Sequence, residues 1–118
     1  MNGKSATVLP LKDYRGRRQT LYFSRPELNQ LLGLYSRNVA RGVWRDYAID
    51  HRDGLALFSV FRHTQEGPAY TIAKSATGTG AAEFAVLCGR QRLRIAPTLS
   101  EALDYFRASL VVVPAASG

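Results

Sequence analysis

Acidic and imidazole side chains that could exchange protons lie close together in the middle of the chain. Asp50 is followed directly by His51, with Asp46 upstream and His63 downstream. A carboxylate that orients an imidazole is a common arrangement for general acid–base catalysis. The surrounding residues alternate as in a β-strand, so Asp50 and His51 should point to opposite faces, and Asp46 should lie about 13 Å from Asp50 at about 3.3 Å per residue. We therefore expect structural carboxylates and no enzyme activity.

The single cysteine, Cys88, is the other candidate for covalent chemistry. A thiolate nucleophile would need a base such as His51 or His63, and the residues around Cys88 do not resemble a reactive-cysteine signature. One cysteine can form neither an intramolecular disulfide nor a multi-cysteine zinc site. We expect Cys88 to be a small core residue, and we expect no catalytic residue, no metal and no cofactor.

A glycine-containing segment, Gly78 to Gly80, could be compared with loops that bind phosphate. It lacks the third glycine, the Lys-Ser/Thr pair and the strand-to-helix context on which such loops depend. The sequence therefore predicts a flexible connection between two strands.

The formal net charge of +7 would suit a phosphate-binding surface. The first 20 residues contribute +4 of this charge, so most of the excess belongs to an N-terminal arm. Sequence-nonspecific nucleic-acid binding by this arm, together with Arg92 and Arg94, is the alternative hypothesis for function. The cations of the arm that would take part are Lys12, Arg15, Arg17 and Arg18.

The elements that would position these residues begin with a helix. Ser24 and Glu27 form a capping box, with a proline in the first turn, where proline is favoured. Gly42 can take the left-handed conformation that ends a helix, so we predict a helix over 25–41. Its apolar stripe has the 3.6-residue period and consists of Leu28, Leu31, Leu32, Tyr35 and Val39.

From Trp44 to Ile95 apolar and polar residues interleave, and turn sequences divide the chain into five strands. Thr98 and Glu101 form a second capping box, which opens a helical stripe of Leu99, Leu103, Phe106 and Leu110. The predicted fold class is α+β, an antiparallel meander sheet of about five strands with two helices packed on one face. We expect a flexible basic arm at 1–19, a single α+β domain at 20–113 and a C-terminal tail at 114–118.

Two turns set the predicted register of the sheet. Asp53-Gly54 is a typical hairpin turn, and Gly89-Arg90 can be interpreted as a second two-residue turn. The resulting pairs share one apolar face, which both helices should cover: Tyr47 with Val60, Ile49 with Phe58, Val86 with Leu93, and Phe84 with Ile95.

The opposite face of this sheet has a mixed composition. The side chains at its centre are small, and Trp44 and Phe61 form an aromatic end. Carboxylate groups lie on one side of this face and guanidinium groups on the other. Exposed apolar patches with a polar rim often mark binding surfaces. The alternative is that the chain's own ends cover this face. We predict a partner-binding site formed by Trp44, Asp46, Asp50, Leu57, Phe61, Arg92 and Arg94.

Three runs of sequence, Phe23 to Tyr35, Val39 to His51 and Phe58 to Arg62, resemble a family of short alphaproteobacterial proteins known as domain of unknown function 2794. The resemblance covers roughly residues 20–110 and is most specific from Trp44 to Asp50. It implies a bacterial, cytoplasmic protein, and it brings no catalytic residue to this chain.

The leading hypothesis from the sequence is a small non-enzymatic protein-interaction module that uses the sheet face around Trp44 and Phe61. Its partner would be another protein or a second copy of the chain. No apolar stretch suits a signal peptide or a membrane span, so we expect a cytoplasmic protein with no membrane partner.

Overall fold

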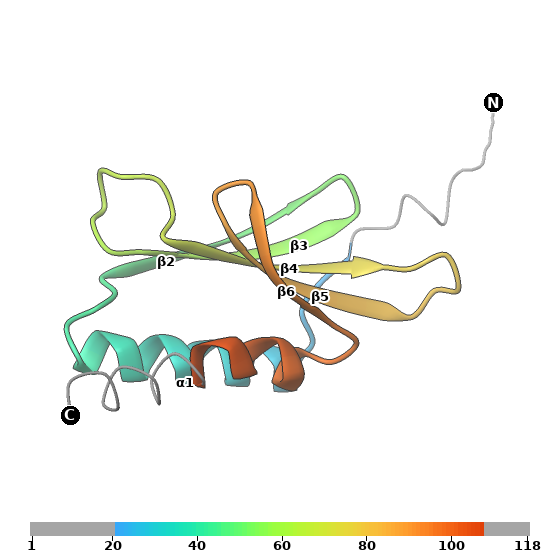
Figure 1. Cartoon of the computed structure of the whole chain (residues 1–118), viewed down its shortest axis with the longest axis horizontal. Helices are drawn as coiled ribbons and strands as arrows, with labels where there is room; N and C mark the ends of the chain where they lie inside the picture. Colours follow the sequence, from blue (N-terminus) through green and yellow to red (C-terminus); the bar gives the residue numbers. More distant parts are fainter. Residues whose placement is uncertain (1–20, 108–118) are drawn as a thin grey trace.

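The computed structural model describes residues 21–107, which form a sheet layer and a helix layer. Both helices lie on the same side of a twisted antiparallel sheet, whose strand order β2-β3-β4-β5-β6 is that of a meander (Figure 1). The α+β fold class predicted from the sequence is therefore confirmed. The elements are α1 (Arg25–Ala40), β2 (Asp46–Arg52), β3 (Leu55–Phe61), β4 (Tyr70–Ala76), β5 (Ala82–Cys88), β6 (Gln91–Ala96) and a second helix at 99–107.

Some predictions lie outside the described residues. These are the basic arm at 1–19, the tail at 114–118, the domain boundaries at 20 and 113, and the burial of Leu110 in the second helical stripe.

Helix α1 begins and ends close to the residues that the sequence analysis identified as its N-terminal and C-terminal signals. The Ser24 N–H donates to Glu27 Oε1 at 2.7 Å and the Glu27 N–H donates to Ser24 Oγ at 3.3 Å, which completes the capping box. At the other end, Gly42 has a φ of +74° and its N–H donates to the Val39 carbonyl. Arg41 is the C-cap, one residue before Gly42, so the predicted helix is confirmed to within one residue.

The buried side of α1 differs from the predicted stripe. Leu31, Leu34 and Asn38 are buried, whereas Val39, predicted to be buried, is 42% exposed. Leu28, Leu32 and Tyr35 pack against the margin of the core. The prediction for Val39 was wrong because a helix on a sheet buries only the side that faces the other elements, and the neighbouring row of the stripe remains half open.

Asn38 links α1 to the start of the sheet. Its Nδ2 donates to the Leu34 carbonyl at 2.9 Å, and its own carbonyl accepts from the N–H groups of Val43 at 2.8 Å and Trp44 at 3.3 Å. A buried polar residue requires such partners. These bonds turn the chain back toward the core immediately after the helix.

The first hairpin has the predicted register. Asp53 and Gly54 both have positive φ angles, +52° and +75°, as a two-residue turn matched to the twist of the strands requires. Tyr47 lies opposite Val60, and the neighbouring apolar pair from the sequence analysis, Ile49 with Phe58, is also confirmed.

The last hairpin departs from the predicted register after its first two pairs. Leu87 lies opposite Arg92, but the register then shifts between Val86 and Leu87. Val86 therefore faces Arg94 instead of Leu93, and the next core residue, Phe84, faces Ala96 instead of Ile95. A bulge adds one residue to one strand, and every later side chain changes face.

The core lies between the sheet and the two helices. Its sheet side is formed by Ala56, Phe58, Val60, Ile72 and Val86, each with no exposed surface. The helix at 99–107 contributes a buried row that begins with Leu99 and ends with Phe106. Cys88, predicted to be a core residue, is exposed because it is the last residue of β5, immediately before a turn.

Candidate functional site

The side of the sheet that faces away from both described helices is the candidate site, and we call it the outer face. The strand register assigns its residues, because every second side chain of a strand lies on the same side. They are Asp46, Ala48, Asp50, Arg52, Leu55, Leu57, Ser59, Phe61, Thr71, Ala73, Ser75, Glu83, Ala85, Leu87, Arg92 and Ile95.

Trp44 does not belong to the outer face, which corrects the sequence prediction. Its side chain is 3% exposed and makes an edge-to-face contact with Phe106, with ring centroids 5.6 Å apart. Strand β2 begins only at Asp46, and the N–H of Arg45 already donates to the Phe61 carbonyl. The alternation of faces therefore does not extend back to Trp44, which belongs to the core.

Arg94 also lies away from the outer face. It is opposite Val86 on the helix side of the sheet, and its Nη1 donates to the Glu101 carbonyl at 3.0 Å. Arg92, two residues earlier, stays on the outer face because the bulge lies between them. The prediction that Arg92 and Arg94 project together from one face of the sheet is therefore wrong.

The centre of the outer face combines apolar side chains with small polar ones. Leu57, Phe61 and Leu87 are half-buried by their neighbours on the sheet. The hydroxyl groups of Ser59 and Thr71, on adjacent strands, are hydrogen-bonded at 3.1 Å. The polar atoms at this centre thus satisfy each other, and the leucine and phenylalanine side chains remain available for contact.

The rim of the outer face along β2 carries an exposed ion pair. Arg52 donates from Nε at 3.0 Å and from Nη2 at 2.5 Å to Asp50 Oδ2. These hydrogen bonds, and a further one from the His51 backbone N–H to Asp50 Oδ1, lower the pKa of Asp50. The same pairing raises the pKa of Arg52.

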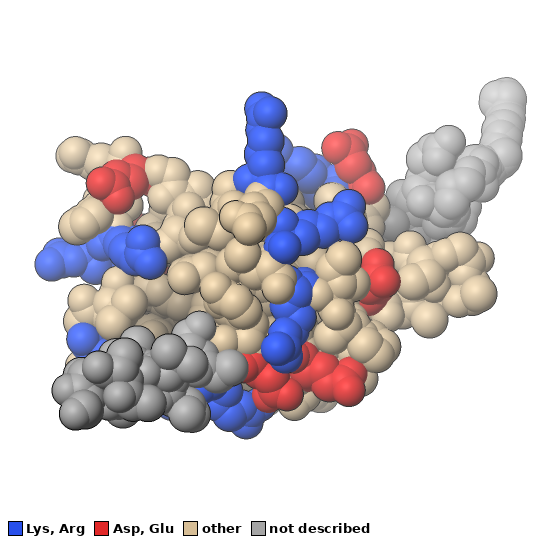
Figure 2. Space-filling model, viewed as in Figure 1, with Lys and Arg blue, Asp and Glu red and all other residues tan. Residues whose placement is uncertain are grey.

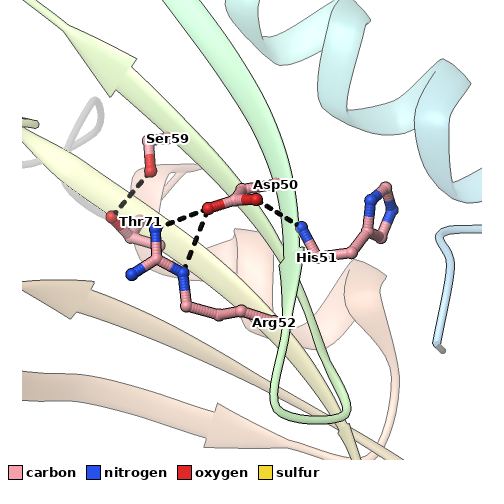
Figure 3. A network of polar contacts seen from close by, with 5 residues as sticks. All are labelled: Asp50, His51, Arg52, Ser59 and Thr71. Atoms are coloured by element: carbon pink, nitrogen blue, oxygen red, sulfur yellow. Dashed lines mark hydrogen bonds and ion pairs between the residues drawn. The ribbon is translucent and has the colours of Figure 1, made fainter.

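The Asp50–His51 neighbours do not form a catalytic pair in this geometry. Figure 3 shows Asp50 and Arg52 on the side of Ser59 and Thr71, and His51 on the other side of the strand. The carboxylate accepts from the backbone of His51 and not from its imidazole. The imidazole packs against the ring of Tyr22 instead, with the two rings tilted by 57° and their centroids 4.6 Å apart.

Charges are scattered over the side of the molecule that Figure 2 shows. On that side, basic side chains lie at several separate places, with acidic side chains near many of them. The four cations of the predicted nucleic-acid arm, Lys12, Arg15, Arg17 and Arg18, lie outside the described residues.

Two other kinds of site are absent from the part of the chain that the structure describes. Residues 21–107 contain no group of three or more histidine, cysteine, aspartate or glutamate side chains arranged to hold a metal ion. Within the same residues, no helix combines the length and the apolar composition that crossing a membrane requires.

Sequence reasoning missed a second exposed surface beside β2. Tyr47 and Ile49 were predicted to be part of the covered apolar face, but they are 39% and 42% exposed. Strand β2 is the first strand of the meander and therefore an edge strand of the sheet. The sequence signal for this exposure was the position of β2 as the first strand of the meander. Such a strand lies at an edge and has a neighbouring strand on only one side, so its side chains are less completely covered.

The fold and this site together define the class of protein. It is a two-layer α+β domain with helices on one face of the sheet. The opposite face has apolar side chains at its centre and charged side chains at its rim. The family model described as "Protein of unknown function (DUF2794)" matches residues 21–88, from the segment before α1 to the end of β5. The chain belongs to this family. No curated protein and no solved structure matches the chain.

Proposed function

We propose that this chain is a non-enzymatic protein-interaction module of the cytoplasm, and that it binds a partner protein through the outer face. The observation that carries the proposal is the half-buried apolar centre of that face, around Leu57, Phe61 and Leu87, on the side opposite to both described helices. A sheet normally buries its apolar face against another layer. Here the second layer would come from the partner.

The charges at the two edges of the outer face define the chemistry of that partner. Asp46 and Asp50 lie on β2 at one edge of the sheet, and Arg92 lies on β6 at the other edge. Rim charges of this kind direct encounter and orientation more than they add affinity. A matching surface would have apolar side chains at its centre, with a basic group near β2 and an acidic group near β6.

Cross-linking from defined positions tests the proposal in living cells. A photoreactive amino acid at Ala85, near the centre of the outer face, should give a discrete cross-linked protein on illumination. The same group at Gln30, an exposed residue of α1, is the matched control and should give none. The product should disappear when Phe61→Arg is introduced, because a charge would then occupy the apolar centre.

Other outcomes of this experiment would contradict the proposal. A product that forms equally from Gln30 and Ala85 would show that the contact is not specific to the outer face. A product that nuclease digests, and whose yield falls steeply with salt, would establish nucleic-acid binding instead.

Once the partner has been identified, a substitution at the rim of the outer face measures how much the rim charges contribute to binding. Arg92→Glu should weaken binding about 5- to 10-fold, mainly through slower association, and the effect should shrink at high salt. Arg107→Glu, on the exposed side of the second helix, is the control and should leave binding unchanged. Equal effects of the two variants would mean that only overall charge matters.

A further inference from the structure

Most of the strongly exposed apolar side chains gather on one side of the molecule. Among residues 21–107, six large apolar side chains are notably exposed, and only Ile95 of these lies at the β6 edge. We call the surface formed by the other five the β2 flank: Tyr22 at 63%, Val39 at 42%, Val43 at 38%, Tyr47 at 39% and Ile49 at 42% exposure.

Contacts between aromatic rings connect the strand part of the β2 flank to helix α1 and to the segment before it. Tyr22, before α1, packs against His51 in a tilted arrangement with ring centroids 4.6 Å apart. Tyr35 of α1 meets Tyr47 edge to face at 4.9 Å. Val39 lies one turn after Tyr35 on the same side of the helix. The flank therefore joins the edge of the sheet to the half-open row of α1.

The same edge carries hydrogen-bond donors that point away from the sheet. The N–H groups of Tyr47 and His51 donate to the side chains of Asp46 and Asp50, each at 2.8 Å, and not to β3. Because alternate N–H groups of a strand point the same way, the N–H of Ile49 faces this side too. Such an edge can pair with another strand when a partner of matching register is available.

We propose that the β2 flank is the contact surface for a second copy of this chain, with the two β2 strands paired antiparallel around a two-fold axis at Ile49. Ile49 is the central residue of Asp46–Arg52, so this register uses the whole strand in both copies. Tyr47 lies opposite the partner's His51, and Ile49 lies opposite the partner's Ile49. The pairing covers the exposed parts of Tyr47 and Ile49 and gives their N–H groups backbone acceptors.

Charge complementarity selects this register. It places Asp46 opposite the partner's Arg52, and the two-fold axis repeats this pair. Arg52 already donates Nε and Nη2 to Asp50, and its guanidinium group has five N–H donors in total, so it can hold both carboxylates. When the partner's carbonyl groups take over the N–H of Tyr47, the carboxylate of Asp46 is released for this contact.

The proposed pairing uses charged residues of the outer-face rim along β2 and leaves the apolar centre of the outer face free. A two-fold axis perpendicular to the sheet keeps both outer faces on the same side of the dimer and both helix layers on the other. The dimer would therefore present two outer faces as one surface, and its formation can be tested without knowledge of any partner protein.

The test is the mass of the full chain in solution, by light scattering and sedimentation, over about 1 to 100 µM. We expect a dimer of twice the 13.0 kDa chain mass. Arg52→Asp should raise the dissociation constant about 100-fold because it places like charges opposite each other, and Asp46→Arg should do the same. The double variant D46R/R52D should restore the dimer, because the two charges are exchanged across the axis.

A backbone variant tests the pairing independently of charge. Ile49→Pro removes an N–H that points away from β3, so the monomer should keep its fold while pairing is lost. Ile95→Asp, at the opposite edge of the sheet, should leave the mass unchanged. A wild-type monomer throughout the concentration range would overturn the proposal. A dimer that survives Ile49→Pro but is lost with Phe61→Arg would overturn it in favour of self-association through the outer face.

Discussion

The two faces of the sheet are built from the same five strands, yet they differ in how completely their side chains are covered. On the helix side, Phe58, Val60 and Ile72 have no exposed surface. On the outer face, Leu57 and Phe61, which neighbour Phe58 and Val60 in β3, are only half-buried. A shift of one residue along a strand thus decides whether a side chain stabilises the fold or is available to a partner.

The two ion pairs of the sheet show the same difference. Lys74, on the helix side, donates to Glu27 Oε1 at 2.7 Å and to the Tyr22 carbonyl at 2.8 Å, and the charged side chains are 12% and 19% exposed. The Arg52–Asp50 pair on the outer face is 66% and 51% exposed. The first pair ties the start of α1 to the sheet, and the second is well placed for contacts with other molecules.

The largest expected effect separates the two aromatic residues that the sequence placed together. Trp44→Ala removes a buried ring from the core and should lower the free energy of unfolding by about 3–5 kcal/mol. Phe61→Ala, on the half-open face, should cost about 1–2 kcal/mol. Urea denaturation of both variants measures the difference. Equal losses would mean that Phe61 is as well covered as Trp44.

A pair of adjacent residues on β6 tests the bulge in the same way. Ala96 is 7% exposed on the helix side, whereas Ile95 is 46% exposed on the outer face. Ala96→Asp should lower the free energy of unfolding by about 2–4 kcal/mol because it buries an unpaired charge. Ile95→Asp should change it by less than about 1 kcal/mol. If thermal denaturation showed Ile95→Asp to be more destabilising than Ala96→Asp, the result would support the register without a bulge.

The smallest effect concerns the ion pair on the helix side. Glu27→Gln should lower the free energy of unfolding by about 1 kcal/mol at neutral pH, and the exposed control Asp50→Asn should have a smaller effect. Urea denaturation at low ionic strength compares the two variants. An equal or larger effect of Asp50→Asn would show that the helix-side pair contributes no special stability.

The pH dependence of this contribution follows from the pKa of Glu27. Partial burial acts to raise this pKa, but hydrogen bonds from Lys74 and from the Ser24 backbone outweigh it, so the pKa is lowered from 4.5. A lowered pKa adds stability that is fully present above pH 4.5 and is lost as the pH falls through the folded-state value. The difference between wild type and Glu27→Gln should therefore shrink below about pH 4.5. A difference that is constant down to pH 3 would contradict the assignment.

Local signals in the sequence were sufficient for the elements and for the first hairpin. The capping residues Ser24 and Thr98 mark the starts of the two helices, and Asp53-Gly54 sets the register of β2 and β3. Each of these features depends on residues that are close in the chain, and their physical preferences act before any tertiary contact forms.

The tertiary structure alone decided which residues of these elements are exposed. The bulge in the last hairpin exchanges the faces of Arg94 and Ile95, and hydrogen bonds to Asn38 draw Trp44 into the core. The edge position of β2 leaves Tyr47 and Ile49 half open. Burial is set by which elements cover a residue, and that depends on contacts between distant parts of the chain, which the alternation of apolar and polar residues along one strand does not record.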